Sequence, residues 1–205
     1  YNHRLAAERR ARGRGGKYIK AYAYTPEPIF LTAEGEDKGS LYYGLEIEMD
    51  SKDDAKCTPE GIARVGLEEL GGVCYFKKDS SLSRGVELVT HPMSARATEK
   101  FFASEGWKLF RKYAKEKGFD GDRDTCGLHI HASKEYYEKN NNLTGKMLLF
   151  FEWHWPELVK FSRREQEDLD RWASRYRSIE ESDKEGGAEE KAREENSRYR
   201  AINLK

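Results

Sequence analysis

Hydrophobic and acidic residues alternate over residues 41–50, where the sequence reads LYYGLEIEMD. In an extended chain they fall on opposite sides, with Leu45, Ile47 and Met49 on one and Glu46, Glu48 and Asp50 on the other. This period of two predicts a strand with one buried face. Further strands are predicted over 73–78, 86–90 and 127–132, and a polar turn over 79–85 joins the first two of these into a hairpin.

Helical patterns separate these strands. A helix is predicted over 59–70, between a Thr58 cap and the pair Gly71-Gly72. A longer amphipathic helix is predicted from the Ser94 cap to Gly118. Strands with hairpin-like neighbours, interrupted by helices, predict an α+β fold with a largely antiparallel sheet.

The remaining segments are less regular. Residues 21–31 contain two prolines and should run extended. An apolar core helix is predicted from Thr144 and should bend at Pro156. Residues 181–195 are densely charged with almost no apolar side chain, which predicts an exposed helix or a mobile loop. The apolar-polar stretch 201–204 is typical of the start of a strand.

Composition narrows the class of protein. The 205 residues include 37 Lys+Arg and 37 Asp+Glu, so the formal net charge of zero excludes a uniformly basic nucleic-acid binder. An aromatic content of 12% indicates a folded domain, with room for a small appendage, despite a mean hydropathy of −0.94. No apolar run approaches the roughly 20 residues of a membrane span, and no signal sequence is recognisable, so we expect a cytoplasmic protein without membrane contact.

Two features of composition are local. Residues 1–20 form a basic arm, which we expect to be a solvated tail or to make weak contact with nucleic acid or a partner protein. Three cysteines, Cys57, Cys74 and Cys126, stand at unrelated spacings, which favours reduced thiols over a disulfide framework or a zinc ribbon.

Acidic side chains gather on the predicted strands. Glu46 and Glu48 point the same way and repel each other unless a cation lies nearby, although an ordinary solvent-facing strand would show the same pattern. Asp79 stands where one strand ends, and Glu87 lies between two apolar residues of the next, so its carboxylate should face away from the core. Alone, these two residues indicate a charged hairpin and nothing more.

Imidazoles complete the candidate site. His129 and His131 share one face of the last predicted strand, and imidazole is a good ligand for divalent metals, although lone histidines are more often structural. Together with the four acids they predict an oxygen-rich site with one nitrogen donor, which suits Mg²⁺ or Mn²⁺ better than structural zinc. Cys126 invites interpretation as a nucleophile, but a packed thiol is favoured because only the histidines could activate it.

Four motifs then resemble one family. GLEIE at 44–48, KDSSLSRGVELVTHP at 78–92, CGLHIH at 126–131 and RYRAINL at 198–204 are similar to segments of the amidoligases of phages and mobile elements, relatives of glutamine synthetase and glutamate–cysteine ligase. The match covers about residues 20–205 in order, so the resemblance makes 21–205 the catalytic domain. It implies a glutamine synthetase-like core, in which a curved antiparallel sheet with helices on one face holds ATP and two or three divalent cations.

The resemblance also implies roles. Glu46 and Glu48 would bind two different metals, Asp79 and Glu87 would join Glu48, and His129 would share the metal of Glu46. Glu48, Lys78 and His131 would bind the nucleotide, and Glu46, Glu48 and His131 would be the catalytic residues. In the related enzymes a further strand with a Glu-x-Arg motif follows the RYRAINL-like segment; the chain stops at Lys205, so we expect a C-terminally incomplete core.

The implied activity is ATP- and Mg²⁺-dependent formation of an amide from a carboxylate and an amine, through an acyl phosphate. Both substrates would be small molecules or peptides, and the enzyme could be a homo-oligomer, as relatives often are. Two alternatives stay open. One is an inactive or truncated ligase fold that serves as a binding or structural component. The other is a metal-dependent phosphodiesterase or nuclease that holds nucleic acid with the basic arm.

Overall fold

A computed structural model describes residues 18–36, 39, 41–140, 142–176, 185–194, 197 and 199–204. All but the last three residues of the predicted basic arm lie outside this part of the chain. The chain divides into two compact units, one of residues 1–133 and one of residues 134–205.

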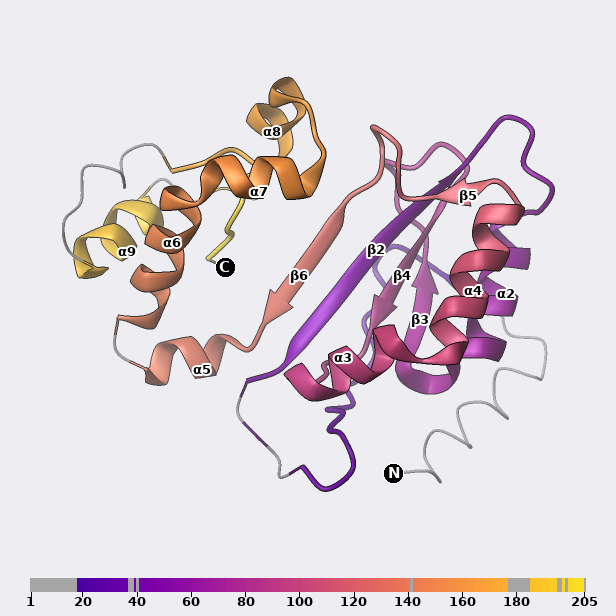
Figure 1. The fold of residues 1–205 in the computed structure, drawn as a ribbon, viewed down its shortest axis with the longest axis horizontal. Coiled ribbons are helices and arrows are strands. Elements are labelled where there is room, and N and C mark those ends of the chain that lie inside the picture. The colour runs from indigo at the N-terminus through magenta and orange to yellow at the C-terminus, as the bar shows by residue number, and fades with distance from the viewer. Residues whose placement is uncertain are drawn as a thin grey trace. The chain divides into compact units, whose positions relative to one another are not determined.

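The first unit is built on one mixed sheet (Figure 1). Its strands are β1 (Ile19–Lys20), β2 (Tyr43–Ser51), β3 (Cys74–Lys77), β4 (Val86–Thr90), β5 (Phe119–Asp120) and β6 (Leu128–Ala132). The order is β1-β3-β4-β2-β5, and β6 also pairs with β2. Strand β2 thus has β4 on one side and both β6 and β5 on the other, all antiparallel.

The predicted α+β class is confirmed, and the strands appear close to where the alternation placed them. The sheet is mixed because β1 pairs with β3 in parallel. The remaining pairings between described strands, including the β3–β4 hairpin, are antiparallel. The curvature of a glutamine synthetase-like core stays a prediction.

Three helices pack on one face of this sheet: α2 (Pro59–Leu70), α3 (Ala95–Ala103) and α4 (Glu105–Glu116). Their apolar residues and one face of the strands form a single core; its fully or nearly fully buried members include Ile62, Phe110, Phe76, Val86 and Leu88. Removing this apolar area from water is the main stabilising contribution. The acidic residues of β2 and β4 are left on the opposite face, as the alternation predicts.

Helix α2 has the predicted caps, whereas the long helix over 94–118 is interrupted. The Thr58 hydroxyl accepts a hydrogen bond from the backbone N–H of Gly61, and Gly71 ends α2 with a φ of 66°. Ser104 takes extended dihedrals (φ −65°, ψ 150°) and caps α4 by accepting from the Trp107 N–H. The prediction of one continuous helix was therefore wrong, because a local Ser cap competed with the helical ladder.

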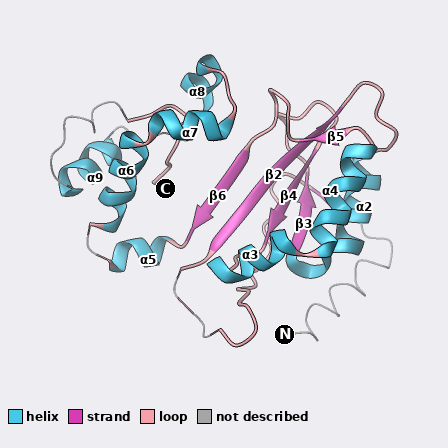
Figure 2. Cartoon of the chain, in the orientation of Figure 1, coloured by secondary structure: helices cyan, strands magenta, loops and turns pink. Residues whose placement is uncertain are grey.

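The second unit is helical (Figure 2). It contains α5 (Lys134–Lys139), α6 (Leu143–Trp153), α7 (Trp155–Ser162), α8 (Gln166–Trp172) and α9 (Glu185–Glu194). Instead of a bend, the chain breaks at His154, and Pro156 lies in the first turn of α7, where proline's missing N–H costs nothing. The stretch 201–204 forms no strand in the described residues; an isolated bridge joins Ser174 to Arg200.

Helix α9 corrects the interpretation of residues 181–195. Its residues Ala188 and Ala192 are fully buried and form a small core with Leu148, Leu149 and Tyr176. The expected exposed helix or loop therefore has one buried face, which two alanines four residues apart are enough to supply. Residues 181–184 and 195 lie outside the described part of the chain.

Two expectations about the whole chain can be compared with the structure. In the described part of the chain no helix combines the length and apolar character needed to cross a bilayer. Among the described residues, Cys57, Cys74 and Cys126 form no disulfide bond.

Candidate metal centre

Strand register brings the acids of β2 and β4 together on the sheet face opposite the helices. Glu48 of β2 is the direct partner of Glu87 on β4, and Glu87 is in turn the partner of Lys77 on β3. Like charges at directly opposed positions repel each other. The pair Glu48–Glu87 is therefore electrostatically unfavourable unless a cation offsets its charge.

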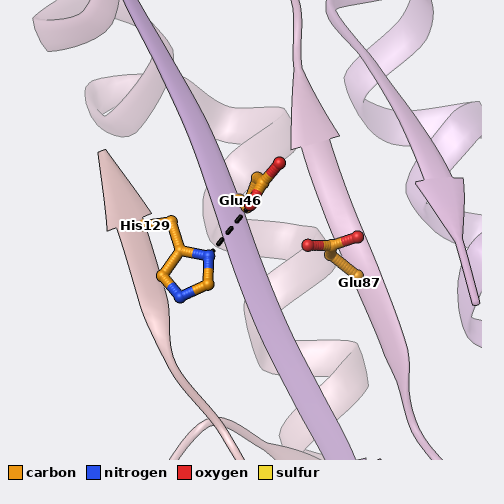
Figure 3. A group of neighbouring side chains, drawn as sticks. All are labelled: Glu46, Glu87 and His129. Atoms are coloured by element: carbon orange, nitrogen blue, oxygen red, sulfur yellow. Dashed lines mark hydrogen bonds and ion pairs between the residues drawn. The ribbon is translucent and has the colours of Figure 1, made fainter. Parts of the chain in front are cut away.

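A histidine of β6 lies opposite Glu46, two residues before Glu48 on β2. Glu46 pairs with His129 on β6, and the two side chains meet through a 2.9 Å contact between Nδ1 and Oε2 (Figure 3). His131 also approaches Glu46, with Nε2 3.3 Å from Oε1. Hydrogen bonds from His129, and then from His131, hold the pKa of the Glu46 carboxyl far below its usual range. In turn, the hydrogen bond to Glu46 raises the pKa of His129.

Glu87 is buried beside other acids, which disfavours its ionised form. Its side chain is only 5% exposed, and Lys77 is its ion-pair partner, with Nζ 3.7 Å from Oε2. Burial, reinforced by the charge of Glu46, raises the pKa of Glu87 to about 7 despite Lys77. A carboxylate in this position gains more than usual from a divalent cation, because the cation offsets both effects.

The side chains form two groups that could each hold a cation. The first contains Glu46, Glu87 and His129, and the second contains Glu48, Asp79 and Glu87. Within each group the candidate ligand atoms all lie within 4.8 Å of one another. Glu87 belongs to both groups, so the two candidate positions are adjacent.

The chemistry of these donors fits Mg²⁺ or Mn²⁺. The second group offers carboxylate oxygens alone, which hard cations such as Mg²⁺ prefer. The first also has two carboxylates, the donors that suit Mg²⁺ and Mn²⁺, and adds one imidazole nitrogen. No thiolate belongs to either group, and structural zinc usually requires cysteines or several histidines.

Asp50 holds the loops that surround this face. Its buried carboxylate accepts hydrogen bonds from the backbone N–H groups of Ser83 and Arg84, both at 2.9 Å, and from the Thr125 hydroxyl at 3.1 Å. Burial alone would raise the pKa of Asp50, but hydrogen bonds from Arg84, Ser83, Ser51 and Thr125 outweigh it and lower the pKa. One carboxylate thus ties the turn after Asp79 and the segment before β6 to the end of β2.

Two backbone contacts bring these loops close to β2. Gly85 lies so near the strand that a Cβ atom would be 2.3 Å from the Met49 carbonyl oxygen. On the other side, the Gly127 N–H donates to the Glu48 carboxylate at 2.5 Å. Asp79 itself is held in its turn because its Oδ1 accepts from the Ser81 N–H at 2.7 Å.

Five of the predicted site residues fall into the two groups, namely Glu46, Glu48, Asp79, Glu87 and His129. His131 lies beside them through its contact with Glu46. Lys78 follows the end of β3 and is exposed, and it is Lys77 that contacts Glu87.

Sequence reasoning missed Lys77 and Tyr75, which share the acidic face. The pKa of Tyr75 is raised to about 12, first by burial and then by the charges of Glu46 and Glu87. The alternation of β3 could have identified both residues, because Cys74 and Phe76 are its core positions.

Cys126 is packed rather than activated. Its thiol is buried, and its Sγ lies 3.7 Å from the carbonyl oxygen of Asp120, to which it donates. Burial, with smaller effects of the charges of Asp50 and Glu48, raises the pKa of Cys126 to about 11. A thiol with this pKa is a poor nucleophile at neutral pH.

Comparison with known proteins adds no relative: no protein-family model, no curated protein and no solved structure matches this chain.

Proposed function

We propose that this chain is an ATP-dependent carboxylate–amine ligase that works with Mg²⁺ or Mn²⁺. The observation that carries the proposal is the pair of candidate cation groups that share Glu87 on one face of the sheet. Two adjacent divalent cations are a recurrent arrangement for phosphoryl transfer. A single structural ion would not need two groups.

The resemblance to amidoligases supports the same proposal. GLEIE supplies Glu46 and Glu48, KDSSLSRGVELVTHP supplies Asp79 and Glu87, and CGLHIH supplies His129, so three separate motifs contribute to one face. We infer a glutamine synthetase-like core on this basis, with the acids on its catalytic face.

The reaction explains why such a face is needed. A carboxylate is a poor acceptor for an amine because oxide would have to leave, so a ligase first transfers the γ-phosphoryl group of ATP to it. The amine then attacks the carbonyl carbon of the acyl phosphate, the C–O bond to phosphate breaks, and the amine loses a proton. Bound cations would offset the charge of the crowded phosphate and carboxylate oxygens.

The residues of this chain have separate tasks in that scheme. Glu46, Glu87 and His129 would hold one cation, and Glu48, Asp79 and Glu87 the other. His131 lies next to Glu46 with an exposed ring, which suits it to contact the phosphates. Lys78 lies just beyond the end of β3, whereas Lys77 contacts Glu87 directly. We therefore assign Lys78 a weaker role in nucleotide binding than Lys77.

The test is calorimetric titration with Mn²⁺ and with Mn–ATP, followed by an assay for ADP release with mixtures of carboxylates and amines. We expect Glu48→Gln to abolish metal-dependent ATP binding and ADP formation, with a nearly unchanged melting temperature, because glutamine can still accept from Gly127. Glu99→Gln, at an exposed position of α3, is the matched control. Turnover by Glu48→Gln, or cleavage of DNA or RNA without ATP, would contradict the proposal.

A further inference from the structure

The acidic face of the sheet continues toward β1 as a basic and aromatic surface. Strand β1 pairs with β3 so that Lys20 lies beside Lys77. Ile19 belongs to the core, so Lys20 points to the opposite face, the one that also carries Tyr75 and Lys77. The row of carboxylates therefore continues into Tyr75 and Lys77 on β3, two strands away from β2, and ends in Lys20 on β1, three strands away.

Two tyrosines that follow β1 lie against these ammonium groups. Lys77 Nζ is 5.6 Å from the ring centroid of Tyr22, and Lys20 Nζ is 5.3 Å from that of Tyr24. Tyr24 also meets Tyr75 edge to face, with 5.5 Å between ring centroids. Cation–π and aromatic contacts of this kind hold the rings in defined positions.

Both rings nevertheless remain open to solvent. Tyr22 is 59% exposed and Tyr24 is 37% exposed. Contacts with the lysines and Tyr75 therefore order the rings without covering them. Bases stack on exposed aromatic rings beside positive charges in proteins that bind single-stranded nucleic acids, and the same contacts suit the base of a nucleotide.

The platform is connected to the candidate metal centre. Lys77 contacts both Tyr22 and Glu87, the acid shared by the two cation groups. At about 4.8 Å between neighbouring strands, β1 and β2 are separated by about 14 Å across the sheet. This is the scale of an extended nucleotide with its phosphates, and it is too long for a single ion or a small carboxylate.

We propose that Tyr22 and Tyr24 bind the base of a nucleoside triphosphate, and that Lys20 and Lys77 neutralise the phosphates that lead from it to the carboxylate groups. This inference rests on the proposed function and adds where the nucleotide lies. Its base is at the β1 edge of the sheet, and its phosphates point toward Glu87. Stacking tolerates any base, so the surface defines the class of ligand and not the identity of the base.

The test compares two ligands that differ only in the part that the tyrosines would bind. Calorimetric titration of the full chain uses Mn–ATP and Mn–tripolyphosphate as probes. Tyr22→Leu and Tyr24→Leu should each weaken ATP binding about tenfold, the typical effect of losing one stacking contact, and leave tripolyphosphate binding unchanged. Lys20→Met should weaken both ligands to a similar extent.

Three controls make the result specific. Tyr22→Phe and Tyr24→Phe keep the rings and should keep the ATP affinity. Tyr18→Leu removes a ring that is 39% exposed but lies near Arg64 of α2, and it should change nothing. Circular dichroism spectra identical to wild type show that each variant is folded.

The outcomes separate this inference from the proposed function. If wild type binds Mn–ATP and both leucine variants bind it equally well, the inference is overturned and the ligase proposal stands. If the leucine variants lose tripolyphosphate as well as ATP, the tyrosines support the fold rather than bind a base, and the inference is overturned too. Failure of wild type to bind Mn–ATP at all would overturn both.

Discussion

Replacing Glu87 by glutamine should make the metal-free protein more stable while removing its response to metal. Glu87 has an ordinary pKa of 4.5 in the unfolded chain and a pKa of about 7 in the fold, because it is buried beside other acids. At about 1.4 kcal/mol per pH unit, the charged form costs the folded state about 3 kcal/mol. Glutamine keeps the shape and carries no charge, so at pH 8 Glu87→Gln should gain up to that amount.

The pH dependence follows with a definite sign. Between pH 4.5 and about 7 the folded state binds the Glu87 proton more tightly than the unfolded chain does. The stabilising contribution of the protonated side chain is therefore complete below pH 4.5 and is lost as the pH rises through about 7. The stability difference between Glu87→Gln and wild type should be small at pH 4.5 and largest near pH 8.

The assay is urea unfolding at pH 4.5 and pH 8, with and without Mn²⁺. Wild type at pH 8 should be stabilised by Mn²⁺, because an ion that binds only the folded state shifts the equilibrium toward it. Glu87→Gln should show no such shift, since both candidate groups lose their shared ligand. Glu99→Gln is again the control. A Glu87→Gln protein that is less stable than wild type at pH 8 without metal would refute the reasoning.

Three further predictions concern residues outside the ligand groups. Cys126→Ala should retain ADP formation, and iodoacetamide at pH 8 should leave Cys126 unmodified, because a thiol with a pKa of about 11 is only about one part in a thousand ionised. Loss of turnover in a folded Cys126→Ala protein would indicate that Cys126 is a nucleophile after all. Asp50→Asn should lower the free energy of unfolding at pH 7 by about 2 kcal/mol and weaken Mn²⁺ binding. Because folding lowers the pKa of Asp50, the difference in unfolding free energy between the variant and wild type should shrink below pH 3.8. Unchanged urea midpoints would contradict this. Ala188→Glu should cost about 3 kcal/mol or more by burying a charge, whereas Glu190→Ala should cost under about 0.5 kcal/mol, as unfolding followed by circular dichroism would show; equal effects would mean that α9 is not packed.

Strands were the easiest elements to predict from this sequence. The alternation in β2 and the hairpin of β3 and β4 each place apolar residues on one face, so period and burial agree. The same alternation put Glu46, Glu48 and Glu87 on a common face. What it could not give was the register, which decides that Glu48 meets Glu87 and that Glu46 meets His129.

Helix ends, and helices with few apolar residues, were harder to predict. Side-chain caps determine the former, and contacts with residues far along the chain determine the latter. Ser104 interrupts the helix predicted over 94–118 because its side chain caps α4. In the sequence, a serine that caps a helix looks like any other serine. Helix α9 depends on Ala188 and Ala192 meeting Leu148 and Leu149, residues about forty positions away in the chain that its own composition does not reveal. The alternation of β3 already places Lys77 on the acidic face, but only the register shows that it meets Glu87 on β4.

The links between β2 and the segment that carries His129 have a consequence for the order of folding. The hydrogen bonds Glu46–His129, Glu48–Gly127 and Asp50–Thr125 join residues 83, 79 and 75 positions apart. Contacts this distant require closure of a long loop and form slowly, whereas the β3–β4 hairpin closes locally. We expect β2, β3 and β4 and their helices to assemble first, with β6 docking last, so that a chain still being synthesised acquires its imidazole only after the carboxylates are in place.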